Sequence, residues 1–188
     1  YNACHLLDAK ASIVKDPNEL KKFDRVILPG VGAYGDAMEH LIETGMNEAV
    51  YEFAKTGKPM IGICLGMQLL FESSQEFGHS NGLSLIDGEV VKFDKSKMNE
   101  DFKIPHMGWN TIVNKKHPLF EGLHNPYLYF VHSYHAVTSE KNVIGTTTYG
   151  YEFVSAVNKD NIFGFQPHPE KSHDNGLKIL KNFMNIKL

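Results

Sequence analysis

Strand-like and helix-like patterns of apolar residues alternate in the first half of the chain. Residues 24–32 (DRVILPGVG) predict a buried strand that ends in a Pro/Gly turn, and residues 57–64 (GKPMIGIC) predict a turn and a second buried strand. Between them, residues 34–44 and 46–56 have helical periodicity and are separated by Gly45. This order of strands and helices is typical of an α/β fold whose central strands run parallel.

The first 23 residues predict three shorter elements. Ala3, Leu6 and Leu7 form the apolar face of a helix at the start of the chain. Residues 11–14 (ASIV) predict a short strand. Residues 16–23 (DPNELKKF) open with a capping Asp and with Pro at the first helical position, which predicts a second short helix.

The pattern changes in the second half, where strand-like runs follow one another at short spacing. A helix predicted over 65–74 runs into a polar loop, and a last helix is predicted over 174–186. The strand-like runs cover residues 88–93, 127–137, 143–150 and 153–166, with a hairpin turn at 158–161 (NKDN). We therefore predict an α/β fold in which one mixed, mostly parallel central sheet carries helices on both faces, within one domain spanning residues 1–188.

Length and composition allow a globular enzyme and argue against two classes of partner. With 188 residues, of which 42% are hydrophobic, the chain can bury a sizeable core. The formal net charge is −3 and no basic stripe stands out, so we expect neither nucleic acid nor an anionic membrane as a partner. No apolar run approaches the roughly 18–20 residues that a membrane-spanning helix needs.

The two cysteines, Cys4 and Cys64, lie in unrelated sequence contexts. This argues against a disulfide framework and favours a reduced, cytoplasmic setting.

Cys64 lies at the junction between the second predicted strand and the helix after it. It stands in the sequence GICLG, with Gly62 two residues before it and Gly66 two residues after it. This is the spacing of a nucleophile elbow, a strained strand-to-helix turn that needs small residues at both flanking positions. The helix start favours a thiolate, and the N–H of Leu65 is expected to point to where an oxyanion develops. The alternative from spacing alone is a small buried side chain at a strand end.

His168 is the best candidate for a base among the ten histidines. It follows an apolar strand in the segment FQPHPEKS, with a proline on each side, and Glu170 lies two residues further on. In an extended segment both side chains share one side, so the carboxylate can hold the imidazole tautomer as the third member of a triad does. The alternative from this segment alone is a proline-stiffened surface loop.

A metal site is the less favoured alternative for two other histidines. His132 and His135 form an H-x-x-H pair, but no third ligand has a suitable spacing, and a strand would place them on opposite faces. We therefore expect no metal. Five other histidines lie in helical or loop contexts with no orienting acid nearby and are expected at the surface: His5, His40, His79, His117 and His124.

Five segments in order along nearly the whole chain resemble the class I (triad) glutamine amidotransferases. From the N-terminal to the C-terminal end they are LPGVGAYGDAM (28–38), GICLGMQLLFE (62–72), PHMGWN (105–110), YFVHSYH (129–135) and FQPHPEKS (165–172). The segments at 28–38, 105–110 and 129–135 narrow the resemblance to the glutaminase subunits that serve a cyclase in histidine biosynthesis. The resemblance implies a flavodoxin-like fold and hydrolysis of glutamine to glutamate and ammonia, without a metal or an organic cofactor. The ammonia is implied to reach a (β/α)₈-barrel cyclase subunit, in a heterodimer, for reaction with a ribulosyl-formimino nucleotide.

The resemblance also implies roles for individual residues. Cys64 is the nucleophile, His168 the base and acid, and Glu170 its orienting partner. Residues implied to hold glutamine or its oxyanion are Gly30, Val31, Leu65, Gln68, His132, Ser133 and Tyr134. Residues implied to face the partner are Trp109, Asn110, Tyr129 and Lys171. As alternatives, Trp109 and Tyr129 are core aromatics and Gln68 is a solvated helix residue.

Three alternative functions stay open at this point. A paralogous glutaminase can supply ammonia for sugar amidination, because a triad is indifferent to the final acceptor. A free-standing cysteine hydrolase of the same fold needs no partner, and a non-catalytic binding module is the least favoured because all three triad members are present.

Members of the family begin with a strand and a glycine-rich turn ahead of the helix that here starts at Tyr1. A central strand is hard to lose, so we expect a further N-terminal segment before Tyr1.

Overall fold

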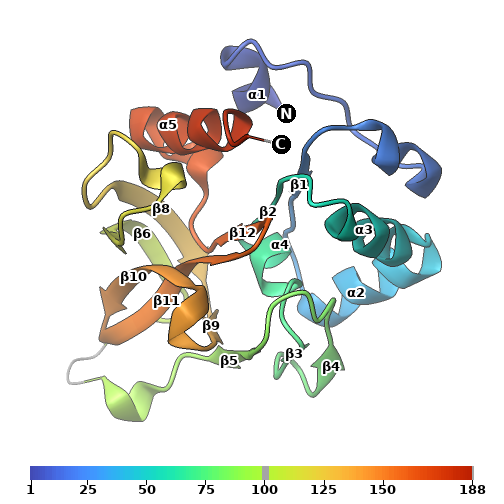
Figure 1. Ribbon diagram of the computed structural model, residues 1–188. Coiled ribbons are helices and arrows are strands. Elements are labelled where there is room, and N and C mark those ends of the chain that lie inside the picture. Colours follow the sequence, from blue (N-terminus) through green and yellow to red (C-terminus); the bar gives the residue numbers. More distant parts are fainter. Residues whose placement is uncertain (99–101, 188) are drawn as a thin grey trace.

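A mixed β-sheet lies at the centre of the molecule, and helices pack on both of its faces (Figure 1). The computed structural model describes residues 1–98 and 102–187. The helices are α1 (Asn2–Leu6), α2 (Tyr34–Glu43), α3 (Met46–Lys55), α4 (Leu65–Gln68) and α5 (His173–Met184). Short 3₁₀ turns occur at Pro17–Lys22, Lys95–Lys97, Pro118–Phe120, Glu140–Asn142 and Pro169–Lys171.

The strands form a ten-stranded sheet and a separate two-stranded sheet. The large sheet has the order β1-β2-β12-β11-β9-β5-β3-β4, and β10 pairs with both β11 and β7. The small sheet pairs β6 with β8. The strands are β1 (Val26–Leu28), β2 (Met60–Ile63), β3 (Ser73–Ser74), β4 (Ser80–Asn81), β5 (Glu89–Lys92), β6 (His106–Thr111), β7 (Val113–Asn114), β8 (Tyr127–His132), β9 (Tyr134–Val137), β10 (Val143–Tyr149), β11 (Tyr151–Lys159) and β12 (Ile162–Phe165).

Strand β2 is the axis of the fold. It pairs in parallel with β1 on one side and with β12 on the other, whereas the pairs that extend the sheet from β12 through β11 to β9 are antiparallel. Because side chains alternate along a strand, neighbouring residues of β2 belong to different core clusters. Met60 belongs to the cluster that includes Val50 of α3, and Ile61 belongs to the cluster that includes Ile179 and Phe183 of α5. The predicted α/β fold with a mixed central sheet and helices on both faces is confirmed. Parallel pairing, predicted for most of the sheet, joins β1 to β2, β2 to β12 and β3 to β5, and the other described pairs of the large sheet are antiparallel.

Most elements predicted from the first half of the chain are confirmed. The strands at 24–32 and 57–64 and the helices at 34–44 and 46–56 are present, and Gly45 between the helices has a φ of 70°. The hairpin predicted at 158–161 is also present, since β11 and β12 pair up to Lys159 opposite Ile162.

The strand predicted at 11–14 is wrong. These residues lie in irregular structure, with Ile13 73% exposed and Val14 packed against the core. A short apolar run becomes a strand only where a neighbouring strand offers a ladder, and local sequence does not supply that partner.

The helix predicted over 65–74 ends much earlier than expected. The α-helix closes at Gln68, and the next turn gives its carbonyl groups to the loop that follows β4. Leu83 N–H donates to Leu69 O, and both Leu85 N–H and Ile86 N–H donate to Leu70 O, each at 2.9 Å. A long-range backbone interaction therefore replaces the helical bonds.

The run at 127–137 contains two strands. Ser133 belongs to neither strand and separates them, so that β8 belongs to the two-stranded sheet and β9 to the large one. Strand β6, the partner of β8, is not predicted from the sequence. In the small sheet Trp109 of β6 lies opposite Tyr129 of β8.

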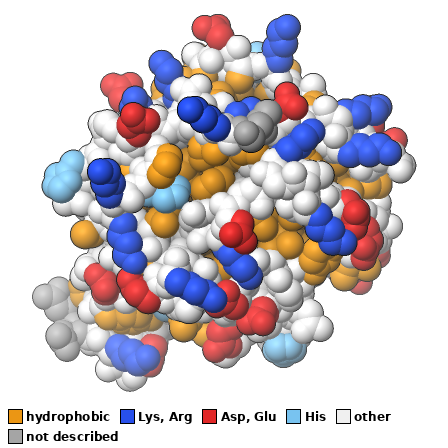
Figure 2. Space-filling view, in the orientation of Figure 1, with side chains coloured by type: hydrophobic (Ala, Val, Ile, Leu, Met, Phe, Trp, Pro, Cys, Tyr) orange, Lys and Arg blue, Asp and Glu red, His pale blue; other side chains and the backbone are white. Residues whose placement is uncertain are grey.

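The exterior agrees with the sequence-based view of charge. On the face shown in Figure 2, basic and acidic side chains are interspersed around exposed apolar ones. Within residues 1–98 and 102–187, no helix has the length and apolar character to cross a membrane.

Candidate active site

Cys64 lies on a tight turn between β2 and α4. Its backbone has a φ of 55° and a ψ of −115°, an unfavourable conformation for a residue with a side chain, at a cost of about 1–3 kcal/mol. The turn is held by a hydrogen bond of 2.7 Å from the N–H of Cys64 to the carbonyl of Phe165, the last residue of β12. The strained strand-to-helix turn predicted from the sequence is therefore present.

The two flanking glycines are required by close backbone contacts. A Cβ atom on Gly62 would lie 2.4 Å from the carbonyl oxygen of Gly66, and a Cβ on Gly66 would lie 1.9 Å from that of Leu28. Gly30 is also in close contact, since its Cβ would lie 2.8 Å from that of Leu65. The segment at 29–32 thus packs directly against the turn that carries the thiol.

His168 and Glu170 form a hydrogen-bonded pair next to Cys64. Nδ1 of His168 lies 2.7 Å from Oε1 of Glu170, although the chain between them is a 3₁₀ turn rather than the extended segment expected. A carboxylate only accepts, so Nδ1 carries the proton and Nε2 is left for Cys64. The backbone of His168 is also fixed, because its N–H donates to the Tyr129 carbonyl at 2.9 Å.

The electrostatics of the pair favour an imidazolium. Burial by itself lowers the pKa of His168, but the hydrogen bonds and charges of Cys64 and Glu170 outweigh it and raise that pKa to about 9. Burial raises the pKa of Glu170, yet the hydrogen bond from His168 brings it below its ordinary value. The arrangement can therefore hold a proton on His168 at neutral pH, beside the sulfur of Cys64.

A cavity of about 330 Å³ opens beside these groups. It is lined by Cys64, His168 and six of the seven residues implied to hold the substrate. The seventh, Gly30, is not among the lining residues and packs against Leu65. The lining residues are Val31, Gly32, Cys64, Leu65, Gln68, Glu76, Pro105, Val131, His132, Ser133, Tyr134 and His168. A cavity of this volume suits a molecule the size of an amino acid.

Gln68 is buried and hydrogen-bonded, not solvated. Its Nε2 donates to the carbonyl of Tyr134 at 3.1 Å and to Oε1 of Gln166 at 2.9 Å. The alternative of a solvated helix residue is therefore wrong.

Glu76 was missed in the sequence, where it is one acidic residue in a polar loop. It lines the cavity, and its Oε2 accepts the N–H of Tyr34 at the start of α2 at 2.7 Å. A hydrogen bond from the N–H of Glu76 to Ser74 Oγ at 3.1 Å fixes the loop. The cavity thus contains a carboxylate suited to an ammonium group, and only the folded position of the loop reveals it.

The two histidines of the H-x-x-H pair lie near the site but not on opposite faces. Both rings contact Phe93, with centroid distances of 5.1 Å for His132 and 4.9 Å for His135. The break at Ser133 changes the alternation that a continuous strand would impose. Among the described residues, no group of three or more His, Cys, Asp or Glu is placed to hold a metal ion.

The residues implied to face a partner lie together beside the triad. Trp109 is 36% exposed and stacks on His173 with ring centroids 5.1 Å apart, and Lys171 is exposed on the 3₁₀ turn that carries Glu170. Tyr129 is half-buried on β8. Asn110 is half-buried, and its Nδ2 donates to the Thr148 carbonyl at 2.9 Å.

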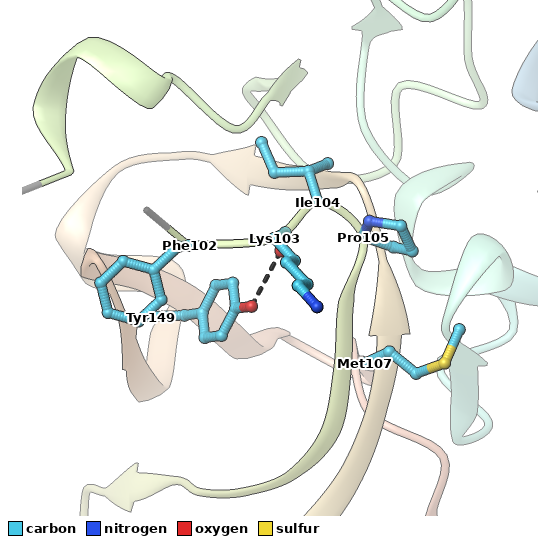
Figure 3. Close-up of a pocket in the computed structure, with 6 residues that line it drawn as sticks. All are labelled: Phe102, Lys103, Ile104, Pro105, Met107 and Tyr149. Carbon is cyan, nitrogen blue, oxygen red and sulfur yellow. Dashed lines mark hydrogen bonds between the residues drawn. The ribbon is translucent and has the colours of Figure 1, made fainter. Parts of the chain in front are cut away.

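A second cavity, of about 560 Å³, adjoins the first at Pro105. Figure 3 shows its walls, where the hydroxyl of Tyr149 donates to the carbonyl of Lys103 at 2.8 Å. Its remaining lining residues are Phe102, Ile104 and Met107, of which Met107 is 62% exposed. The pocket is open to solvent on the same strand, β6, that carries Trp109.

Comparison with known proteins identifies relatives over nearly the whole chain. The model of the family described as glutamine amidotransferase class-I matches residues 3–186. The chain is 61% identical over 188 residues to the imidazole glycerol phosphate synthase subunit HisH of Wolinella succinogenes, covering 98% of this chain and 92% of that protein. It is 64% identical over 188 residues to the protein of the same name from Sulfurimonas denitrificans, covering 99% and 91%.

Solved structures agree at the level of the fold. A chain from the structure of PurLQS from Thermotoga maritima has a TM-score of 0.75 at 21% identity, covering 98% of this chain and 90% of that one. A crystal structure of a glutamine amidotransferase has a TM-score of 0.73 at 18% identity, covering 97% and 91%.

Proposed function

Because the chain belongs to the glutamine amidotransferase class-I family, we propose that it is the glutaminase subunit of imidazole glycerol phosphate synthase. In this role it hydrolyses glutamine to glutamate and ammonia and delivers the ammonia to a (β/α)₈-barrel cyclase subunit in histidine biosynthesis. The observation that carries the proposal is the His168–Glu170 pair beside Cys64 at the wall of a cavity of amino-acid size. Two relatives above 60% identity with the synthase-subunit name support the pathway.

The cavity offers complementary groups to both ends of glutamine. Glu76 supplies a carboxylate for the α-ammonium group, and the backbone of His132–Tyr134 lies along the wall where the α-amino-acid end would be held. The carboxamide then faces Cys64. Leu65 is the first residue of α4, so its N–H has no acceptor within the helix and is available to an oxyanion.

The first half of the reaction forms a thioester. The Cys64 thiolate attacks the carboxamide carbon, a C–S bond forms, and the carbonyl electron pair moves to oxygen, where Leu65 N–H and the 30–31 segment stabilise it. As the oxyanion collapses, the C–N bond breaks and His168 gives its Nε2 proton to the departing nitrogen. Ammonia leaves and a γ-glutamyl thioester remains on Cys64.

The second half releases glutamate. His168 is now neutral and takes a proton from water, whose oxygen attacks the thioester carbon. The C–S bond then breaks, which regenerates the Cys64 thiolate beside the His168 imidazolium. Glu170 stabilises that cation in both halves through its hydrogen bond to Nδ1.

The exposed face of β6 and β8 is the surface we assign to the cyclase. Met107, Trp109 and Tyr127 are large apolar side chains that are 36% to 62% exposed. Lys171 is exposed two residues before His173, the residue on which Trp109 stacks. Clustered exposed aromatic and apolar groups on a small sheet are typical of a protein interface. Its position next to Glu170 puts the partner close to the site where ammonia forms.

Partner docking is also expected to regulate the reaction. Val31 is 84% exposed and is followed by Gly32, which has a φ of 98°, so the 30–32 peptides can reorient at low steric cost. An oxyanion donor that turns into place only in the complex would raise turnover by about 10²–10³. Such a device prevents loss of ammonia when no acceptor is bound.

We further propose a cytoplasmic setting and one glutamine amidotransferase domain over residues 1–188. The two cysteines are unpaired and buried, as expected for a reduced compartment, and the family match spans 3–186.

The test is release of glutamate from glutamine by the chain alone, with the barrel cyclase, and with the cyclase and its nucleotide substrate. We expect a rise of at least about 10² only in the third condition. Equal rates in all three would contradict channelling and favour a free-standing hydrolase. Stimulation by a sugar-amidination enzyme in place of the cyclase would reassign the pathway.

A further inference from the structure

The sulfur of Cys64 has a neighbour that the triad does not include. Nε2 of Gln166 lies 3.8 Å from Cys64 Sγ, within hydrogen-bond range for sulfur. Gln166 follows β12, two residues before His168, and its side chain is completely buried. A buried amide is expected to be hydrogen-bonded to its polar neighbours.

The direction of this hydrogen bond is set by groups further along the network. The carbonyl of Tyr134 can only accept, so the Gln68 atom 3.1 Å from it must be the amide nitrogen. The second hydrogen on that nitrogen points to Gln166 at 2.9 Å, which must therefore present its oxygen to Gln68. The remaining end of the Gln166 amide, its NH₂ group, faces the sulfur.

The Tyr134 carbonyl is itself held from a second side. Nδ1 of His132 donates to it at 2.8 Å, which leaves Nε2 of His132 as an acceptor for Nδ1 of His106 at 3.0 Å. Burial lowers the pKa of His106 to about 4 and that of His132 to about 3, so both rings stay neutral and keep these tautomers at pH 7. The Tyr134 carbonyl, which orients Gln68 and through it Gln166, is therefore itself held in place by buried side chains.

We propose that Gln166 is a catalytic residue that donates an amide hydrogen bond to the Cys64 thiolate, and that Gln68 is the positioning residue that aims it. The proposal rests on Cys64 being the nucleophile of the proposed function. The need for such a donor follows from the structure, because α4 has only four residues and its dipole gives less support than a full helix. A buried thiolate beside one imidazolium gains from a second donor that carries no charge of its own.

The experiment measures how readily Cys64 forms its thiolate. The rate of alkylation by iodoacetamide is followed against pH in the full chain, with the modified cysteine identified by mass spectrometry. Gln166→Met keeps the length and removes the donor. We expect the midpoint of its profile to move up by about one pH unit, and its alkylation rate at pH values below both midpoints to fall roughly tenfold, because a hydrogen bond to an ionised group is lost. The plateau rate at high pH should stay near that of the wild type.

Gln75→Met is the matched control. Gln75 is an exposed glutamine whose Nε2 donates to Glu89 at 2.9 Å, and it does not contact Cys64. Its profile should overlay the wild type. Gln68→Met leaves Gln166 in place but frees its amide to rotate, so we expect a smaller shift in the same direction, and this variant decides the question if Gln166→Met does not fold.

An unchanged midpoint in a folded Gln166→Met variant, or in Gln68→Met where Gln166→Met does not fold, would overturn the proposal. Alkylation needs no glutamine, so the result is independent of the proposed function. Absence of glutamate release by the wild type would contradict glutaminase activity while leaving a shifted alkylation profile as evidence for the hydrogen bond.

Discussion

The turn that carries Cys64 and the small β6–β8 sheet lie side by side but are built in opposite ways. The turn is enclosed by parallel strands β2 and β12 and by backbone contacts that no side chain at Gly62 or Gly66 would allow. The small sheet has two antiparallel strands and presents Trp109 and its apolar neighbours to solvent. The first is what a reaction needs, a fixed geometry, and the second is what an interface needs, an accessible apolar surface.

We call the Cys64 turn with the His168–Glu170 pair the chemical part of the molecule, and the exposed face of β6 and β8 the docking part. If this division is right, substitutions in the chemical part reduce turnover and leave association with the cyclase intact, while substitutions in the docking part weaken association and leave turnover intact.

Cys64→Ala should abolish glutaminase activity, lowering turnover by at least about 10⁴, because it removes the nucleophile. Binding to the cyclase should persist. Glutamate release is measured with cyclase and nucleotide present, and affinity by titration calorimetry. Cys4→Ala, at the other buried cysteine, is the control and should retain activity. Glutamate production by Cys64→Ala would remove the chemical role from the turn.

Glu170→Gln should lower kcat far more than it changes KM for glutamine, because the carboxylate acts on His168 and not on the substrate. The kcat can fall by up to about 10⁴, and the decrease is smaller where the nucleophile is a thiol that ionises readily. Steady-state kinetics separate the two parameters. Glu152→Gln, at an exposed carboxylate on β11, makes the same chemical change away from the site and should behave as wild type. Unaltered kcat in Glu170→Gln would make Glu170 a loop residue only.

Trp109→Ala should weaken binding of the cyclase by about 30-fold, as expected for an aromatic hot spot, and leave alkylation of Cys64 unchanged. The exposed position of Trp109, stacked on His173, is the basis for this expectation. Val137→Ala, at an exposed apolar residue of the large sheet, should not alter affinity. Equal affinity for wild type and Trp109→Ala would place the interface elsewhere.

The pH dependence of stability should come from the chemical part. The folded-state pKa of His168, about 9, lies above its ordinary value of 6.5, so the folded state binds this proton more tightly than the unfolded state. The resulting stabilisation is fully present below about pH 6.5 and is lost as the pH rises through about 9. Urea unfolding across this range should show the decline, and Glu170→Gln should reduce it. A decline of equal size in both proteins would assign the dependence to other groups.

The chemical part was largely predictable because its residues lie in short segments. Gly62, Cys64 and Gly66 are recognised within five residues, although the backbone that Gly66 approaches is that of Leu28 on β1, and the spacing of His168 and Glu170 is equally short. Glu76 was not predictable in this way, since it reaches the cavity only through the fold of its loop against α2.

The docking part was less predictable because its strands depend on each other. Strand β6 contains Gly108, with a φ of 140°, and lacks a simple apolar alternation, so it is recognised as a strand only when paired with β8. The separation of β8 from β9 at Ser133 likewise depends on pairing, because the two halves of one apolar run pair with strands of two different sheets. The local sequence pattern does not show which strands will be the partners.

The most direct test of the account is covalent labelling with an electrophilic diazoketone analogue of glutamine. Such a reagent must bind as glutamine does before it meets the nucleophile, so it tests the cavity and the thiol together. We predict one adduct per chain, on Cys64, with labelling that glutamine slows by competition. Labelling of Cys4, or labelling of Cys64 that glutamine does not slow, would contradict the assignment of this cavity as the glutaminase site.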